Sequence, residues 1–302
     1  MELFKKLYFV FFLFLFFSGK SLNLNLNHIK YDSDFVQVSS VTHENEEYKV
    51  VYMRRKDFRV RAKYFAYKLD GKNVYFRYNN WKASKDIVMI SSGTYMDVEK
   101  DEYGNKRWNL VGITIDQGEI VNEKIERGRM EGLVIVYPHG GIRVFNISKG
   151  NITVPDPNGD KTFNLSTSDG LTYFKRWAIK MRATVFQTHL LAWNNELSFK
   201  SNYNSKPNKR ERRFLAIGES YNGEKIHCII HKPEFQSLHE SSEKVLNFLK
   251  KRKRMKVSAL LNLDTGMQDV CEVYTKSGAL NNMIKGKTDI RNAQNLLVYY
   301  FQ

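Results

Sequence analysis

The chain has 302 residues, of which 42% are hydrophobic and 14% aromatic, so it can bury a large core and is not a disordered protein. Its 48 Lys and Arg residues outnumber its 32 Asp and Glu residues, and the formal net charge of +16 favours polyanions, anionic membranes or phosphorylated substrates as partners. Only Cys228 and Cys271 are present; export would permit a disulfide between them, but both could equally be buried thiols.

The N-terminus has the order of a secretory signal peptide. Two lysines precede an apolar run at residues 7–17, and the small residues Ser18, Gly19 and Ser21 follow as a suitable cleavage region. The run is short for a bilayer span, so an uncleaved anchor is the less favoured alternative. We therefore predict a signal peptide at residues 1–21, a secreted or periplasmic protein, and no stable membrane span after cleavage.

Residues 34–90 carry the alternating apolar pattern of β-strands. The clearest runs are residues 48–53, 58–67 and 73–78. Between the last two, Asp70-Gly71 is typical of a hairpin turn. We predict that residues 22–85 form an N-terminal β-rich segment packed on the main domain.

The alternating pattern continues through the rest of the chain and is joined by two helical segments. The predicted strands are residues 111–115, 132–137, 142–147 and 214–217, and the predicted helices are residues 169–183 and 237–254. Glycine-containing turns such as Gly140-Gly141 separate the strands. The prediction is an α+β fold with a mixed, mainly antiparallel sheet and a few packed helices, in which residues 86–302 form a single domain of catalytic type.

The most informative stretch is residues 260–266, where an apolar run ends at Asp264 and the turn Thr265-Gly266 follows. A strand that delivers a carboxylate to a glycine-containing loop places that charge at a sheet edge, where a ligand can approach the backbone. An ordinary strand and turn would have the same local pattern, so other motifs must decide between the two interpretations.

Six short motifs occur in an informative order along residues 86–300. They are Ser92-Gly93-Thr94-Tyr95-Met96-Asp97, residues 111–118, Phe186-Gln187-Thr188, Arg212-Arg213-Phe214-Leu215-Ala216, residues 261–266, and Arg291 with Asn295-Leu296-Leu297-Val298. Each motif alone is weak, but together and in this order they resemble those of the phosphodiester glycosidase family. The resemblance implies a secreted hydrolase that cleaves sugars from phosphodiester-linked glycans or phosphate-containing envelope polymers, with an anionic or phosphorylated glycan as substrate.

The resemblance also implies site residues. Such a reaction needs a carboxylate, guanidinium forks and backbone donors around an anionic phosphate. The implied catalytic set is Asp264 as acid, base or metal ligand, Arg213 and Arg291 as phosphate clamps, and Asn295 as an orienting residue; the implied substrate-binding set is Ser92, Gly93, Gln187, Arg212, Thr265 and Gly266. In the structural alternatives, each arginine is an ordinary exposed cation, Asp264 caps a turn, and Asn295 satisfies backbone groups.

Two positions depart from the family pattern. Ser92 replaces an Asn and so lacks an amide donor, and Thr265 replaces a Gly, so its side chain narrows access of a phosphate to the backbone. These departures leave open a second function, a non-catalytic module that binds anionic glycans or phosphosugars through the same basic pocket. An open pocket on which Asp264 and the arginines converge would favour the enzyme, whereas a plugged pocket would favour binding.

Some acidic, histidine and basic residues are also candidates for binding a metal or a nucleic acid. Asp264, Asp269 and Glu272 could contribute oxygens to a divalent cation such as calcium, although the spacing does not match an EF-hand loop. His227 and His231 are four apart, which on a strand permits ligation but fits structural histidines better. The basic run at residues 250–254 has no interleaved aromatic residues and ends a predicted helix, so we expect no nucleic-acid partner.

Overall fold

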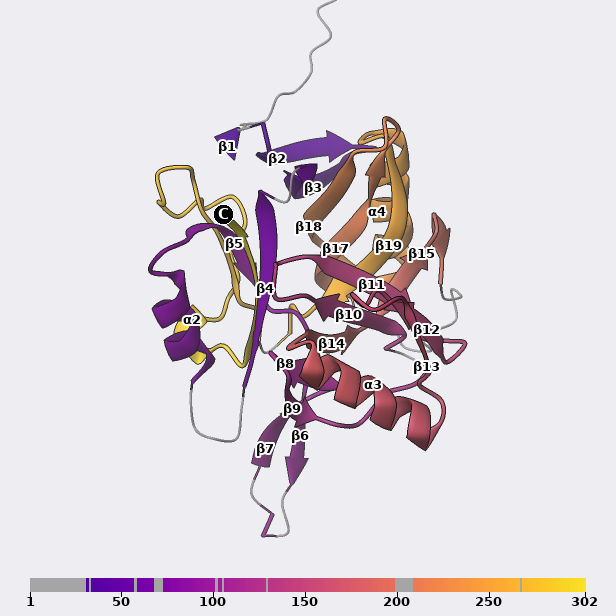
Figure 1. Cartoon of the computed structure of the whole chain (residues 1–302). Helices are drawn as coiled ribbons and strands as arrows, with labels where there is room; N and C mark the ends of the chain where they lie inside the picture. The colour runs from indigo at the N-terminus through magenta and orange to yellow at the C-terminus, as the bar shows by residue number, and fades with distance from the viewer. Residues whose placement is uncertain are drawn as a thin grey trace, which may run out of the picture.

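The computed structural model of the chain is a single α+β domain built mostly of β-structure (Figure 1). It describes residues 31–32, 34–56, 59–67, 73–100, 103–104, 106–128, 130–198, 209–266 and 268–302. Every strand pair in these ranges is antiparallel, so the predicted fold class is confirmed. The predicted signal peptide and the predicted turn at Asp70-Gly71 lie outside the described residues.

The largest sheet has eight strands and carries one helix on one of its faces. Its order is β1 (Tyr31–Asp32), β2 (Val36–His43), β3 (Glu46–Arg54), β18 (Lys225–Gln236), β17 (Arg210–Ser220), β19 (Met255–Leu263), β15 (Leu190–Trp193) and β16 (Glu196–Leu197). Phe214 points to the face that packs on α4 (Leu238–Lys251), where Tyr48 stacks on Phe248 at 4.2 Å. Leu215 points to the opposite face, as the period of two along a strand requires.

Two further sheets complete the main body. The five-stranded sheet has the order β11 (Ile142–Asn146), β10 (Gly132–Val136), β14 (Thr184–Thr188), β8 (Thr114–Asp116) and β9 (Glu119–Asn122), and α3 (Ser168–Lys180) covers it. The four-stranded sheet has the order β20 (Cys271–Val273), β5 (Asp86–Ser91), β21 (Asn295–Phe301) and β4 (Val60–Ala66), with α2 (Val74–Lys82) packed on it. Two hairpins, β6 (Met96–Lys100) with β7 (Lys106–Leu110) and β12 (Asn151–Val154) with β13 (Lys161–Asn164), and the short helix η3 (Ile290–Asn292) complete the described elements.

The three larger sheets share one hydrophobic core. Leu215 and Leu261 come from the eight-stranded sheet, Phe186 from the five-stranded sheet, and Tyr64 and Tyr299 from the four-stranded sheet. Tyr64 stacks on Phe186 with 4.3 Å between ring centroids, which joins two of the sheets directly. Because strands from residues 36–66 pair with β18 and β21, the N-terminal part of the described chain is hydrogen-bonded into two of these sheets.

The two predicted helices are confirmed as α3 and α4, but the prediction of a strand at residues 73–78 is wrong. This segment begins α2, where the Asn73 side chain accepts a hydrogen bond from the Tyr75 N–H at 2.8 Å and caps the helix. Val74, Tyr78 and Trp81 then recur at helical spacing and pack on the four-stranded sheet. The alternation of aromatic and polar residues over six positions was too short to distinguish the two periods.

Cys228 and Cys271 are both buried and free, so the structure contains two thiols and no disulfide between them. No helix in the described part of the chain has the length and apolar character that a membrane span needs.

A buried cation links β3, β18 and α4. Lys232 is fully buried and binds the carboxylates of Glu46 and Glu234, the latter at 2.8 Å. Glu46 also accepts hydrogen bonds from Lys244 and from Gln236. Burial alone would raise the pKa of Glu46, but these hydrogen bonds outweigh it and lower that pKa from 4.5 to about 2.

We expect Glu46→Gln to reduce the free energy of unfolding at neutral pH. A carboxyl whose pKa is depressed in the folded state stabilises the fold above its ordinary pKa, and that contribution is lost as the pH falls from 4.5 towards about 2. Urea unfolding at a series of pH values should therefore show a weaker pH dependence over this interval in Glu46→Gln than in the wild type. Glu44→Gln, which removes an exposed acid on the same hairpin, is the control, and equal slopes in Glu46→Gln and the wild type would contradict the assignment.

Candidate functional site

Asp264 follows the last residue of β19 and is 5% exposed. Its Oδ1 accepts a hydrogen bond from the Gly266 N–H at 2.7 Å, which closes a tight turn. A methyl group built on Gly266 would lie 3.0 Å from Asp264 Oδ1 and 3.5 Å from Arg210 Nη1, so both groups face the same point. Burial raises the pKa of Asp264, and the Gly266 N–H, Arg210 and Arg213 offset only part of that effect.

Arg213 is wholly buried on β17, opposite Leu263 in the strand register. Its Nη1 lies 2.8 Å from Asp269 Oδ1, and its Nε and Nη2 have no hydrogen-bond partner among the described residues. The second oxygen of Asp269 accepts a hydrogen bond from the Lys287 N–H at 3.3 Å. The ion pair therefore neutralises the arginine that the sequence predicted as a phosphate clamp.

Arg212 lies on the other face of β17 and is 5% exposed. Burial and the neighbouring Arg210 lower the pKa of Arg212 to about 10, whereas Tyr95 raises it. The Tyr95 hydroxyl accepts a hydrogen bond from Asn262 Nδ2, and its ring meets His189 edge-on at 5.0 Å. The strand register shifts between Arg210 and Arg212, and such bulges re-aim side chains near functional sites.

We call Asp264, Arg210, Arg212, Arg213 and Tyr95 the Asp264 cluster. Arg210 and Tyr95 were not among the predicted site residues, although both lie inside or beside the predicted motifs. The signal for Arg210 is its place in the same charged run as Arg212; strand alternation would not have placed it, because the register shifts between Arg210 and Arg212.

Asn295 holds the loop that contains Ser92 and Gly93. Its Oδ1 accepts hydrogen bonds from the N–H groups of Gly93 and Thr94 at 2.7 and 3.1 Å, and its Nδ2 donates to the Thr94 carbonyl at 3.1 Å. Ser92 Oγ donates to the Gln268 carbonyl and accepts from the Val270 N–H at 3.1 Å. The side chains of Asn295 and Ser92 therefore hold neighbouring backbone segments together. This is the structural role that was the alternative for Asn295.

Gln187 also has a backbone-binding role. Its Oε1 accepts hydrogen bonds from the N–H groups of Ile113 and Glu126 at 2.8 and 3.0 Å. Its Nε2 donates to the carbonyls of Glu126 and Met130 at 3.0 and 2.8 Å. All the ordinary hydrogen-bonding capacity of this buried amide is used, so none is left for a substrate.

Arg291 lies on η3, and its exposed guanidinium binds Asp289 through Nε at 3.0 Å and Nη2 at 2.6 Å. The Arg291 carbonyl accepts a hydrogen bond from Asn73 at the start of α2. Within the described residues, no contact joins Arg291 to Asp264 or Arg213. The structure thus brings Asp264 and Arg213 together with Asp269, and it leaves Arg291 bound to another partner.

The residues around Asp264 do not fit the expected calcium site. The guanidinium of Arg213 binds Asp269 and also lowers the pKa of Asp264, so a cation already occupies the electrostatic position that a metal would take. Among the residues that the structure describes, no group of three or more His, Cys, Asp or Glu side chains could hold a metal ion. His227 Nδ1 lies 3.0 Å from the Tyr299 hydroxyl, and His231 Nε2 lies 3.8 Å from Glu211.

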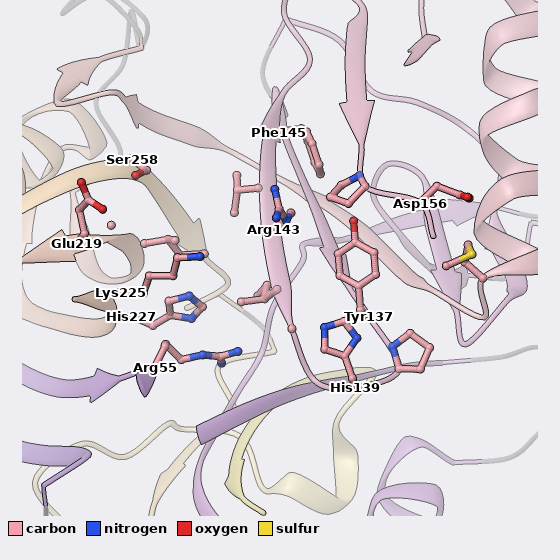
Figure 2. Close-up of a pocket in the computed structure, with 18 of the residues that line it drawn as sticks. Arg55, Tyr137, His139, Arg143, Phe145, Asp156, Glu219, Lys225, His227 and Ser258 are labelled. Carbon is pink, nitrogen blue, oxygen red and sulfur yellow. The ribbon is translucent and has the colours of Figure 1, made fainter. Parts of the chain in front are cut away.

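A sizeable cavity lies away from the Asp264 cluster (Figure 2). Its volume is about 870 Å³, and its lining includes Ile217, Glu219 and Lys225, at the end of the β17–β18 hairpin remote from Arg213. None of the predicted site residues lines this cavity or the three smaller ones described with it. No local motif predicts this cavity, because its polar residues come from distant segments of the chain.

Comparison with known proteins assigns no family. No family model matches the chain, and no curated protein sequence is similar to it. The catalytic domain of zebrafish N-acetylglucosamine-1-phosphodiester alpha-N-acetylglucosaminidase, solved in a form auto-inhibited by its pro-peptide, is 11% identical over 92% of this chain and 87% of that chain, with a TM-score of 0.46. A hypothetical protein from Synechocystis is 11% identical over 88% of this chain and 62% of that chain, also with a TM-score of 0.46. Similarity at this level does not assign a function.

Proposed function

We propose that the chain is a hydrolase that releases sugars from phosphodiester-linked glycans or phosphate-containing envelope polymers at the Asp264 cluster. The observation that carries the proposal is the position of Asp264, a buried carboxyl with a raised pKa that faces the same point as Arg210. An acid of this kind is suited to proton transfer, because burial keeps it protonated at a higher pH than an exposed carboxyl.

The proposed reaction breaks the bond between the sugar carbon and the phosphate oxygen. A water oxygen forms the new bond to the sugar, and the phosphate leaves as a monoester. Protonated Asp264 donates its proton to the leaving oxygen and regains one from the attacking water. Arg210 and Arg212 are the groups that would stabilise the negative charge on the phosphate, because a planar guanidinium can bind two of its oxygens.

The N-terminal sequence supports an extracytoplasmic location for this activity, and the net charge of +16 supports an anionic substrate. The order of the sequence motifs supports the choice of a phosphodiester over other anions.

A second candidate is a non-catalytic module that binds anionic glycans or phosphosugars through the same arginines. It is favoured by the closure of the site: Asp264 is 5% exposed, and Arg213 is neutralised by Asp269. The Thr265 hydroxyl also donates to the Glu211 carbonyl at 3.1 Å, so this side chain stands between the turn and β17. Such a site could hold a phosphate at its rim without aligning a sugar for attack.

Asp264→Asn is expected to keep the fold and to lower the release of sugar from a sugar phosphodiester by about 100-fold or more, the usual contribution of a general acid. The amide is nearly isosteric but cannot transfer the proton. Sugar release should be assayed beside Asp160→Asn, a matched control at an exposed acid. Unchanged turnover in correctly folded Asp264→Asn would rule out the catalytic role, and binding without turnover in the wild type would leave the binding module.

The pH profile provides an independent check. If Asp264 acts as the acid, kcat/KM should fall as the pH rises through its pKa, because the deprotonated form has no proton to donate. The midpoint should lie above the ordinary range of an aspartate, since burial raises the pKa of Asp264. Initial rates measured from acid to neutral pH should show this limb in the wild type and lack it in the residual activity of Asp264→Asn.

A further inference from the structure

The proposed function does not use the cavity at the far end of the β17–β18 hairpin. Figure 2 shows Arg55, Lys225 and His227 on one side of it and Tyr137 and His139 on the other, with Arg143 between them. The volume of about 870 Å³ lies within the range of pockets that hold small organic ligands.

Two buried side chains in the wall have polar atoms without a partner. Arg55 is 7% exposed; its Nη2 donates to the Gly140 carbonyl at 3.0 Å, whereas its Nη1 has no hydrogen-bond partner among the described residues. Tyr137 is 8% exposed, and its hydroxyl is likewise without a partner in the described structure. Buried polar groups are usually paired in folded proteins, and here Arg55 Nη1 and the Tyr137 hydroxyl lie in the wall of one cavity, where a ligand would supply their missing partners.

The cavity also carries excess positive charge. Arg143 and Lys225 are exposed and form no ion pair with any described residue, so with Arg55 they supply three cations. Of the two acids in the lining, Asp156 accepts hydrogen bonds from Trp177 Nε1 at 3.0 Å and from the Asn158 N–H at 2.9 Å. The other acid, Glu219, lies opposite Lys225 in the strand register, and Figure 2 shows Asp156 at the other end of the cavity. The three cations in the lining therefore exceed the two acids by one charge.

His227 contributes a neutral donor or acceptor. Burial, with Arg55 and Lys225 nearby, holds the pKa of His227 well below its usual range, so the ring is uncharged at neutral pH. Its Nδ1 is bound to the Tyr299 hydroxyl, and its other nitrogen has no partner within the described chain. The ring is therefore held in place with one nitrogen available to a ligand.

The loop between β10 and β11, which carries His139 and the carbonyl that binds Arg55, requires glycine at two positions. Gly140 has φ +80°, and a Cβ there would lie 2.5 Å from Arg61 Cβ. A Cβ on Gly141 would lie 2.6 Å from His139 Nε2. Larger residues would displace the Gly140 carbonyl that orients Arg55.

Most of the remaining lining is apolar. It includes Ile142, Val144, Phe145, Met181 and Ile217. A ligand that fills the cavity should therefore combine an anionic head with a ring or an apolar body.

We propose that this cavity is a second binding site and that it takes a small soluble phosphomonoester with a ring or apolar body. A phosphomonoester carries a charge of about −1.5 to −2 at pH 7 and three terminal oxygens. That charge and geometry match three cations with two further polar groups, Tyr137 and His227, better than the single charge and two oxygens of a carboxylate. The proposal does not depend on the hydrolase activity at the Asp264 cluster.

The test is calorimetric titration of phenyl phosphate into the full chain. We expect saturable binding to the wild type, weakened about tenfold or more in Arg143→Met and in Lys225→Met, because each loses a charge-assisted contact. Both residues are exposed, so the variants should fold, which thermal melts will check. Arg252→Met is the matched control, since Arg252 is an exposed arginine at the end of α4 and should bind as the wild type does.

Benzoate and phenol test the chemical class. Benzoate should bind at least about tenfold more weakly than phenyl phosphate, and phenol should not saturate. Equal affinity for benzoate and phenyl phosphate would overturn the phosphomonoester assignment. Absence of saturable binding in the wild type would overturn the site itself, as would binding that Arg210→Met abolishes while Arg143→Met and Lys225→Met leave it unchanged, because the anion would then lie at the Asp264 cluster.

Discussion

The ion pair between Arg213 and Asp269 is the contact on which the arrangement of the molecule around Asp264 depends. It lies where the eight-stranded sheet meets the four-stranded sheet, with Arg213 on β17 and Asp269 on the segment that leads into β20. Both side chains are almost completely buried, so removal of either would leave an uncompensated charge in the interior. The position of the turn after β19 is therefore tied to the relative position of the two sheets.

Hydrogen bonds around this ion pair extend the same constraint to the remaining segments. Ser92 exchanges bonds with Val270 and Gln268, and Asn295 binds the backbone at Gly93. A site clamped in this way is well suited to hold charged side chains in fixed positions, which is what electrostatic stabilisation of a phosphate requires. The same contacts limit access to Asp264. The hydrolase requires a substrate to reach this carboxyl, whereas the binding module does not.

Cationic side chains lie at both ends of the long hairpin formed by β17 and β18. Arg210, Arg212 and Arg213 lie at one end, whereas the cavity that contains Lys225 and His227 lies at the other. At one end the charge is partly neutralised by buried carboxylates, and at the other the cations face a cavity. The anionic ligands proposed for these two regions would therefore bind near opposite ends of one hairpin.

The sequence by itself determined the fold class and the elements with strong local patterns, because the alternation in strands such as β17 and the helical spacing in α4 are local. It also predicted Asp264 and the arginines of β17 as site residues, through motifs whose residues are neighbours along the chain. It missed α2, whose aromatic side chains become a helical face only against β4, and it missed Arg55, Arg143 and Lys225, which meet in one cavity from three distant segments. Whether an arginine is open to a ligand or neutralised by an aspartate depends on which segments pack against it, and only the tertiary structure decides that, since burial and ion pairing arise from contacts that no local pattern encodes.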